Sequence, residues 1–489
     1  MSLQCPSLAE LFVQARDAGA VVKSENLKTV LIFAHECAPY HRVQSTVAAQ
    51  RPAQFAKYLP KFGWRAIVVC CDATQRGAEW SSLHPIRDRA AHAIKSSDPS
   101  ESVIIPTPSL PWDGLLDRIW RAVSRERAGR WAPLLRKPLT VAKLLTGDYS
   151  QAWQPCARAA ATGIISAIRI DACLGEHSPD AGLFLARWFS NQFGVPWIAD
   201  FRDAILQPFR PALRVAYAPI ARRLLSSASC VVNVTPYWSE LDGQLFGRPT
   251  ATIPNGYDPE EFADPVPAEA LACFTVAYTG HIWREMRLSI FLQGLAALRA
   301  ILGEEFREVR FAYRGAHHEE VKQSAEKVGI GDVVDSKPHI PRAESLALLR
   351  RAEVLLLLSI AGAARQDIYL KKGIYPGKTF EYFGAGRPIL CVPGDQGLLD
   401  ELLSRTGTGV TLDTPDRIAA YLAAAFRRWK GGSPREHRVR SEEVARYSRR
   451  ALSGHLAHLL DRATKASGAS EPTGATVPER ERPSGALIP

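Results

Sequence analysis

Short apolar runs alternate with longer stretches of helical periodicity from residue 27 onward, and this alternation constrains the fold more than any other feature of the sequence. Such alternation is typical of α/β proteins with parallel sheets, whose strands are apolar throughout because helices cover both faces. Seven such runs form a first series, and they begin at Leu27, Arg65, Ser102, Asp171, Pro196, Ser229 and Ala251. Six more form a second series, and they begin at Phe274, Val309, Asp332, Glu353, Arg387 and Thr408.

The two series meet in a segment where Pro259, Pro265 and Pro267 would interrupt any helix or strand. A chain of 489 residues also exceeds the usual size of a single hydrophobic core. We therefore predict two Rossmann-like domains with parallel sheets, residues 27–265 and residues 266–464, that face each other across a cleft. The last helix of the second domain is expected to return to the first.

The two ends of the chain lie outside this pattern. Residues 1–26 are expected to form an irregular or partly helical N-terminal arm. Residues 465–489 have the proline, serine, glycine and charge bias of a disordered tail.

Cysteine usage and apolar content bear on the compartment. The nine cysteines are odd in number, form no CxxC pair and lie partly in apolar runs, which favours buried, reduced thiols. The first residues show no basic-then-apolar signal pattern, and no apolar stretch is long enough to span a membrane. We therefore expect a cytoplasmic protein.

The formal net charge of +11 is concentrated in one insert, at about residues 110–146. Between Arg118 and Lys143, eight basic residues and one acidic residue give a local charge of +7. Because Trp120 and Trp131 lie among these charges, we predict that the insert binds an anionic membrane surface, the inner face of the cytoplasmic membrane. A basic helix pair packed on the first domain is the alternative. No recognisable nucleic-acid-binding module accompanies the charge, so no nucleic-acid partner is expected.

The segment PGKTFEYFGAGRPIL, residues 376–390, carries the most chemistry. It predicts a short helix that begins near Gly377 and Lys378 and is followed by a buried strand. Free backbone N–H groups, the positive end of the helix dipole and a lysine ammonium together form a phosphate site without a metal. Glu381, one turn later, can accept hydrogen bonds from two vicinal hydroxyls, such as those of a ribose. A surface Lys–Glu pair that caps the helix fits the spacing equally well.

This segment resembles the donor-site stretch of GT-B glycosyltransferases, in particular of the family 4-like group. Three further segments agree with that family in order and spacing: ADFRDA from Ala199, ATIPNGYDPEEF from Ala251 and YTGHIWREMR from Tyr278. The similarity extends over roughly residues 27–460. It implies a GT-B fold and an enzyme that transfers a sugar from a nucleotide-diphosphate sugar to an acceptor hydroxyl. Family relatives retain the anomeric configuration, and the leaving phosphate helps to deprotonate the acceptor.

The resemblance also implies roles for individual residues. Glu381 would take the ribose hydroxyls, and Lys378 with Arg284 or Arg287 would neutralise the diphosphate. Gly280 would let the backbone approach the donor closely. Residues 337–341 would read the nucleobase through their backbone, which makes the side chain of His339 a bystander. The full donor-binding set is Gly280, Arg284, Arg287, Lys337, His339, Gly377, Lys378, Thr379 and Glu381.

The sequence departs from the family in two places. The first glutamate of the family's glutamate pair falls on Gly373, which has no side chain to recognise the sugar hydroxyls. The glycine pair that usually follows the first strand is also absent. His41, Arg42 and Arg51 stand in that region instead and are available for an anionic acceptor or for the donor phosphates.

Two further positions concern the acceptor side. Arg202 and Asp203 follow an apolar strand at a place where relatives often carry a histidine, and with Lys378 they are the candidate catalytic residues. An internal Arg–Asp pair that pins the loop is nearly as good an explanation. Glu176 and His177 follow another strand, and a polar loop is favoured there, although His177 remains an acceptor-side candidate.

Motifs for other chemistries are missing from the sequence: there is no P-loop, GxGxxG, HExxH, GxSxG, zinc spacing or Asp-x-Asp. We therefore expect no metal and no cofactor, with a nucleotide sugar and a sugar or lipid-linked acceptor as the partners. A nucleotide-sugar epimerase, or a noncatalytic protein of the same fold that binds nucleotide sugars, is the alternative.

Overall fold

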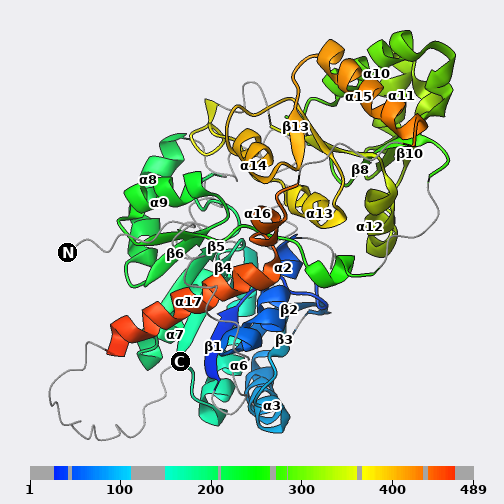
Figure 1. Ribbon diagram of the computed structural model, residues 1–489. Coiled ribbons are helices and arrows are strands. Elements are labelled where there is room, and N and C mark those ends of the chain that lie inside the picture. The colour runs from blue at the N-terminus through cyan, green and yellow to red at the C-terminus, as the bar shows by residue number, and fades with distance from the viewer. Residues whose placement is uncertain are drawn as a thin grey trace, which may run out of the picture.

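A computed structural model shows two α/β domains, each built on one parallel sheet (Figure 1). It describes residues 27–41, 47–76, 78–111, 149–207, 211–264, 271–283, 285–360, 366–432 and 439–468. The predicted N-terminal arm, most of the basic insert and nearly all of the predicted tail lie outside the described residues. The predicted domain boundary at residues 265 and 266 also lies outside them.

The first sheet has seven strands in the order β3-β2-β1-β4-β5-β6-β7, and every pairing is parallel. The strands are β1 (Lys28–Phe33), β2 (Trp64–Arg76), β3 (Val103–Ser109), β4 (Ala172–His177), β5 (Trp197–Phe201), β6 (Cys230–Asn233) and β7 (Thr250–Thr252). The helices of this domain are α2 (Val47–Tyr58), α3 (Leu83–Ser96), α6 (Gln154–Ala167), α7 (Ala181–Phe193), α8 (Pro211–Leu225) and α9 (Pro236–Phe246). Short 3-10 helices are η2 (Leu59–Phe62), η3 (Trp80–Ser82) and η4 (Tyr149–Trp153).

The second sheet has six parallel strands in the order β10-β9-β8-β11-β12-β13. They are β8 (Phe274–Thr279), β9 (Val309–Arg314), β10 (Val334–Lys337), β11 (Val354–Leu358), β12 (Ile389–Val392) and β13 (Gly409–Thr411). The helices are α10 (Leu288–Leu302), α11 (His318–Lys327), α12 (Arg342–Arg351), α13 (Gly377–Ala385), α14 (Leu398–Thr406), α15 (Pro415–Lys430) and α16 (Ser441–Ala445). The 3-10 helices η6 (Gly303–Glu308) and η7 (Gly331–Val333) belong to this domain, and η5 (Pro259–Phe262) lies in the link between the domains.

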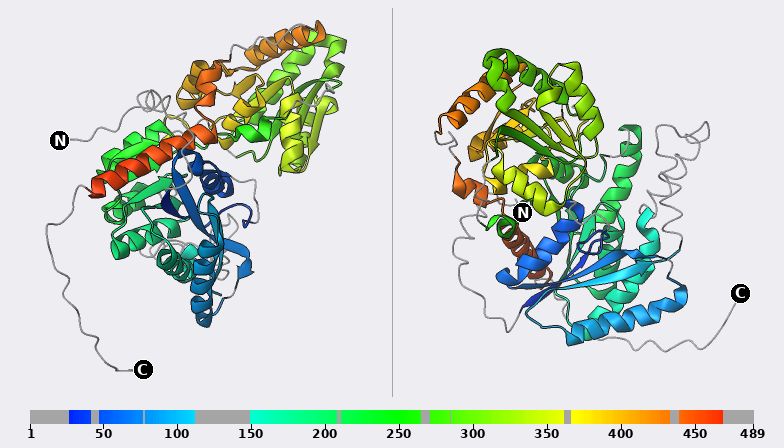
Figure 2. Two further views of the ribbon diagram at one scale, coloured as in Figure 1. Left: turned by 60° about the horizontal axis from the view of Figure 1, so that its bottom comes forward. Right: turned by 90° about the vertical axis from the view of Figure 1, so that its right-hand side faces the viewer.

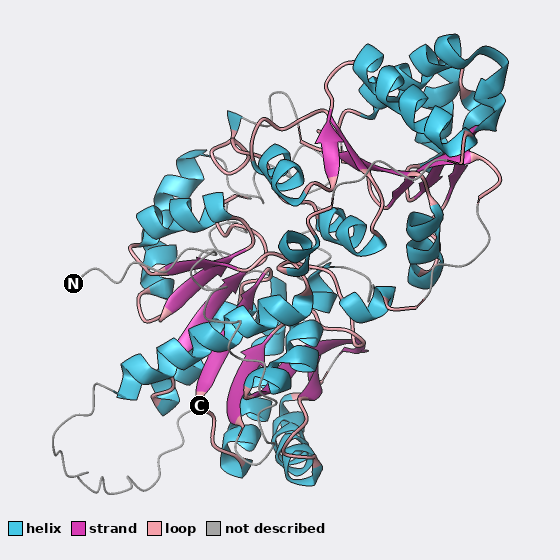
Figure 3. Ribbon diagram, in the orientation of Figure 1, coloured by secondary structure: helices cyan, strands magenta, loops and turns pink. Residues whose placement is uncertain are grey.

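Helices cover both faces of each sheet, which explains why the central strands are largely apolar (Figure 3). In β11 all five residues, VLLLL, are buried. On one face of the first sheet, α3, α6 and α7 form the core, and on the other face α2 packs with the last helix, α17 (Arg449–Gly468). The fold class predicted from the sequence is therefore correct.

Helix α17 returns from the second domain and lies along the first (Figure 2). Its apolar residues Leu452, Leu456 and Leu460 are buried in the core of the first domain, and Asp461 forms an ion pair with Lys28 at 2.6 Å. The chain thus passes between the domains at η5 and again before α17.

In the described part of the chain no helix is both long and apolar enough to cross a membrane. The cysteines of that part are all free, and all but Cys273 are buried.

Candidate active site

A cavity of about 570 Å³ lies between the two domains. Its walls come from the segments that follow parallel strands of both sheets, which is where α/β proteins bind their ligands. Seven of the residues predicted from the sequence line it: Arg202, Asp203, Gly280, His339, Gly377, Lys378 and Glu381.

Lys378 lies in the first turn of α13, directly after Gly377. Its Nζ is 5.1 Å from the centre of the Tyr278 ring, and no hydrogen bond or ion pair joins it to another described residue. Burial lowers the pKa of Lys378, although the nearby Glu381 carboxylate acts in the opposite direction. The free protein therefore holds a cation in this wall without a direct anionic partner, at a helix N-terminus that also favours an anion.

Gly280 makes the position of this lysine possible. Its φ of 113° is unfavourable for other residues, and a Cβ atom there would lie 2.6 Å from Lys378 Nζ. The sequence suggested that Gly280 gives room to the donor. In the structure the space beside it is taken by the lysine side chain.

Glu381, one turn after Lys378, forms an ion pair with Arg342, whose Nη1 lies 2.8 Å from Glu381 Oε1. The same guanidinium donates two hydrogen bonds of 2.7 Å to the carboxylate of Glu261, in η5. The sequence does not indicate Arg342, since its partners lie 39 and 81 residues away in the chain.

Two more basic residues of the cavity wall, Arg314 and His281, were not predicted from the sequence. Arg314, at the end of β9, forms an ion pair of 2.5 Å with Asp335. His281 follows Gly280, and its Nε2 lies 3.4 Å from Nε2 of His317. Burial lowers the pKa of His281, and the positive charges of His317, Lys378 and His339 lower it further. The position of His281 directly after the Tyr-Thr-Gly strand end is the signal that could have found it.

Three predicted donor-binding residues that the structure describes do not line the cavity. Arg287 is exposed just before α10, and Lys337 is exposed at the end of β10, where it pairs with Asp335 at 3.3 Å. Thr379 is fully buried on α13. Arg284 lies outside the described residues.

On the first domain's wall, Arg202 is surrounded by carboxylates. It lies 3.5 Å from Asp203, 3.6 Å from Glu36 and 3.9 Å from Glu176, and it also donates to the carbonyl oxygen of Ser178. The internal Arg–Asp pair considered from the sequence is therefore present, and both of its members also line the cavity. Asp203 is 53% exposed, so its carboxylate is accessible.

The expectation for Arg51 was wrong. Its side chain is only 2% exposed, with two hydrogen bonds of 2.8 and 2.7 Å to Asp200 and one of 3.1 Å to the carbonyl oxygen of Pro254. The reason is that Asp200 lies inside β5, where a buried carboxylate needs a cation. Arg51 is thus unavailable to an acceptor or to the donor phosphates. His41 pairs with Glu36 at 3.6 Å and does not line the cavity, and Arg42 lies outside the described residues.

The prediction of a polar loop at Glu176 and His177 is also wrong. These two residues end β4, and each is 3% exposed. His177 Nδ1 lies 2.5 Å from Asp180 Oδ1, and its ring packs against Phe201. Burial raises the pKa of Glu176 well above its usual range, although the charge of Arg202 opposes this. Strand β4 extends to His177 because Glu176 and His177 have polar partners inside the domain, Arg202 and Asp180.

Gly373 has a φ of 83°, and a side chain there would collide with Oδ2 of Asp395. Asp395 accepts hydrogen bonds from the backbone N–H groups of Gly397, Leu399 and Asp400 and so caps α14. Glycine at this position is therefore required by the local backbone.

No group of three or more His, Cys, Asp or Glu side chains that could hold a metal ion occurs among the described residues.

Comparison with known proteins identifies the class. Residues 48–256 match the family model of the glycosyl transferase 4-like domain. The solved structure of OtsA aligns with 91% of this chain and 100% of its own, at 13% identity and a TM-score of 0.52. The N-terminal domain of the Candida albicans trehalose-6-phosphate phosphatase aligns with 91% and 98%, at 11% identity and a TM-score of 0.51. Anabaena HepE in complex with UDP aligns with 91% and 99%, at 12% identity and a TM-score of 0.47. No curated protein matches the sequence.

The first domain thus carries a glycosyl transferase 4-like domain, and the arrangement of the two domains is the GT-B fold. The predicted class of enzyme, a glycosyltransferase, is confirmed.

Proposed function

We propose that the cavity binds a nucleotide-diphosphate sugar and that the protein transfers the sugar to an acceptor hydroxyl. The observation that carries this proposal is Lys378: an ammonium without a direct anionic partner, at the first turn of α13 and in the wall of an interdomain cavity. Glu381, one turn away on the same helix and also in the cavity wall, supplies a carboxylate that can accept hydrogen bonds from ribose hydroxyls.

In this proposal Lys378 and the free N–H groups at the start of α13 neutralise the diphosphate. Their contribution grows as the glycosidic bond breaks, because the leaving diphosphate gains charge in the transition state. His281 is close enough to join them. Glu381 orients the ribose, and the backbone near His339 meets the nucleobase. Arg202 and Asp203, on the opposite wall, face the sugar and the incoming acceptor.

We further propose a retaining transfer that requires no metal and no cofactor. Arginine, lysine and backbone dipoles then meet the charge of the leaving group, and the leaving phosphate takes the proton of the acceptor hydroxyl. The support is the match to a glycosyl transferase 4-like domain together with the basic wall around Lys378. The anomeric configuration of the product, measured by proton NMR, tests the retaining outcome.

A panel of nucleotide sugars tests the function. Each compound is scored for protection against thermal unfolding, and then for diphosphate release with and without candidate acceptors. Release that depends on an acceptor supports a transferase. A changed sugar without an acceptor would indicate an epimerase, and binding without turnover would indicate a noncatalytic protein. Glu381→Ala, which should weaken this protection, is the control variant.

The acceptor is proposed to be a sugar or a lipid-linked sugar of a cell-envelope polysaccharide, used by a cytoplasmic protein that attaches peripherally to the membrane. This proposal rests on the basic segment between Arg118 and Lys143 with its tryptophans. Each basic side chain near an anionic surface contributes about 1 kcal/mol. Flotation with vesicles that contain or lack anionic lipid tests it, and flotation that does not depend on lipid charge would contradict it.

A further inference from the structure

We propose that Arg342 is a positioning residue for the nucleotide: it fixes the carboxylate of Glu381 toward the ribose and anchors it to the segment that joins the two domains. The inference rests on the nucleotide site proposed above, and it assigns to that site a residue that neither the sequence pattern nor the family likeness indicates.

The geometry begins with the guanidinium. Arg342 is the first residue of α12, and its Nε and Nη2 donate to the two oxygens of Glu261 at 2.7 Å each. Two parallel hydrogen bonds of this kind hold the planar guanidinium in one orientation. The third contact, from Nη1 to Glu381 Oε1 at 2.8 Å, therefore has a fixed direction.

This contact leaves part of Glu381 free. Oε2 of Glu381 takes no hydrogen bond from any described residue. One carboxylate oxygen is thus held by Arg342, and the other can accept the hydroxyls of a ligand. A free glutamate would lose side-chain entropy when it meets a ribose, and a glutamate that is already held in place loses less.

Burial distinguishes this cluster from a surface ion pair. The side chains of Arg342, Glu261 and Glu381 are 26%, 27% and 25% exposed, whereas freely exposed pairs contribute little. Burial lowers the pKa of Arg342, but the two carboxylates outweigh this effect and raise it. Burial lowers the pKa of Arg449; the charges of Arg51 and Arg342 lower it further, and those of Glu261 and Glu381 oppose this.

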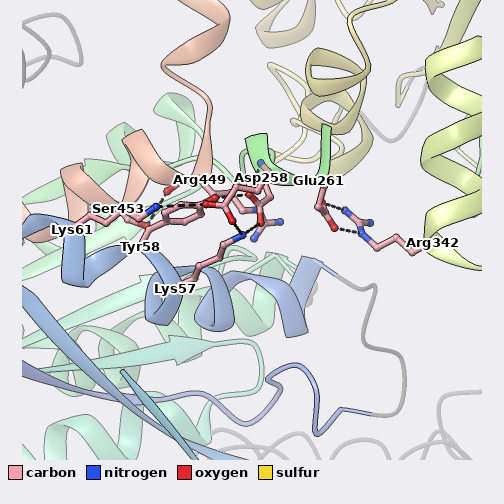
Figure 4. A network of polar contacts seen from close by, with 9 residues as sticks. Lys57, Tyr58, Lys61, Asp258, Glu261, Arg342, Arg449 and Ser453 are labelled. Carbon is pink, nitrogen blue, oxygen red and sulfur yellow. Dashed lines mark hydrogen bonds and ion pairs between the residues drawn. The ribbon is translucent and has the colours of Figure 1, made fainter. Parts of the chain in front are cut away.

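The cluster continues into the first domain (Figure 4). Asp258, three residues before Glu261, accepts hydrogen bonds from Lys57 at 2.7 Å and from Tyr58 at 2.5 Å, both on α2. The polar contacts therefore run from α2 through η5 to α12 and then to Glu381 on α13. The carboxylate that is proposed to hold the ribose is connected to the joint between the domains.

The test compares ribose with deoxyribose. UDP, GDP and ADP are titrated into the wild type by calorimetry, and the tightest binder is then compared with its 2′- and 3′-deoxy forms. Each hydrogen bond from a hydroxyl to a carboxylate contributes on the order of a tenfold affinity, so the wild type should prefer the ribonucleotide by about that factor or more. Glu381→Gln should reduce this preference.

Arg342→Met should reduce the same preference by roughly tenfold and leave the affinity for the deoxynucleotide within about twofold. Glu261→Gln should act in the same direction, since it releases one side of the guanidinium. Arg342→Met added to Glu381→Gln should change the preference no further. Arg342→Lys should restore it only in part, because an ammonium cannot form the paired contacts. Arg350→Met is the control: Arg350 is also on α12 and donates to the carbonyl oxygen of Asp264, so its loss should leave the preference unchanged.

Equal weakening of ribo- and deoxynucleotide in Arg342→Met would overturn the inference, because it would mean a direct contact elsewhere or a general effect on the fold. An unchanged preference in both Arg342→Met and Glu261→Gln would overturn it as well. The proposed function fails separately, if the wild type binds no nucleoside diphosphate or if Glu381→Gln leaves the preference intact.

Discussion

Replacing Lys378 by methionine should make the protein more stable and the enzyme slower. In the free protein the Lys378 ammonium sits in the cavity wall over the Tyr278 ring, without a hydrogen bond or ion pair to a described residue. Removing an ammonium from water costs several kcal/mol when burial is complete, and a cation–π contact returns only about 2 kcal/mol of this. Because the side chain is only partly buried, we expect Lys378→Met to gain about 1 kcal/mol in free energy of unfolding.

In the proposed function the same charge is needed when the diphosphate of the donor is bound. A charge-assisted hydrogen bond contributes about 1.5 to 3 kcal/mol, which corresponds to a loss of roughly 10- to 150-fold in turnover. Because charge on the leaving group grows in the transition state, turnover should fall by more than nucleotide affinity does.

The gain in stability should depend on pH with a definite sign. Burial lowers the pKa of Lys378 in the folded protein below the ordinary 10.5. The unfolded chain therefore binds the proton more tightly, and wild-type stability recovers as the pH rises through the lowered pKa toward 10.5. The advantage of Lys378→Met should be complete at neutral pH and should shrink over that alkaline range.

Urea unfolding at several pH values, with kcat and KM for the best nucleotide sugar, measures both effects. Lys337→Met is the control, because Lys337 is exposed and does not line the cavity. It should change neither quantity. A Lys378→Met protein that is less stable by 1 kcal/mol or more and keeps its turnover would refute the reasoning and make Lys378 a structural residue.

Three further substitutions follow from the same site. Gly280→Ala should lose about 1 to 3 kcal/mol of stability and weaken nucleotide binding, because its φ of 113° is strained for alanine and the new Cβ displaces Lys378; unfolding and calorimetry measure the two losses. Gly373→Glu, which restores the family residue, should lower the melting temperature and bring no gain in turnover, because the side chain collides with Asp395. Asp203→Asn should change stability by less than about 1 kcal/mol, since the Asp203 carboxylate is 53% exposed, while kcat falls; an unchanged kcat would contradict the proposed catalytic role.

The fold could be predicted because parallel strands that are covered on both faces are continuous apolar runs in the sequence. Strand β11 is an unbroken apolar run, and such runs alternate with helices in both domains. The apolar pattern is less clear at the sheet edge, where β10 is only half-buried. The predicted strand begins at Asp332, whereas β10 begins at Val334. The apolar pattern does not predict the end of β4, because Glu176 and His177 are polar residues that tertiary partners bury.

The site could be predicted only in part. Residues that are close together in the sequence were found, and residues paired across long distances in the sequence were not. Lys378 and Glu381 are neighbours on one helix, so their spacing alone brings them together. Arg51 pairs with a residue 149 positions away in the chain, and Arg342 pairs with residues 81 and 39 positions away. No local sequence pattern predicts such contacts. The sequence therefore predicted Arg51 as an acceptor-side residue, whereas it is buried against Asp200, and it did not indicate Arg342 in the cavity wall beside Glu381.

The missing family glutamate also has a structural consequence that supports the Asp203 prediction. The carboxylate of Asp395 lies where a side chain at residue 373 would begin, but its oxygens are engaged with the N-terminus of α14, so it cannot stand in for the glutamate. Among the described residues that line the cavity, the acidic ones are Glu381, which Arg342 holds, and Asp203. Asp203 lies on the opposite wall with half of its side chain exposed, so in the described part of the cavity it is the carboxylate left for the proposed sugar or acceptor.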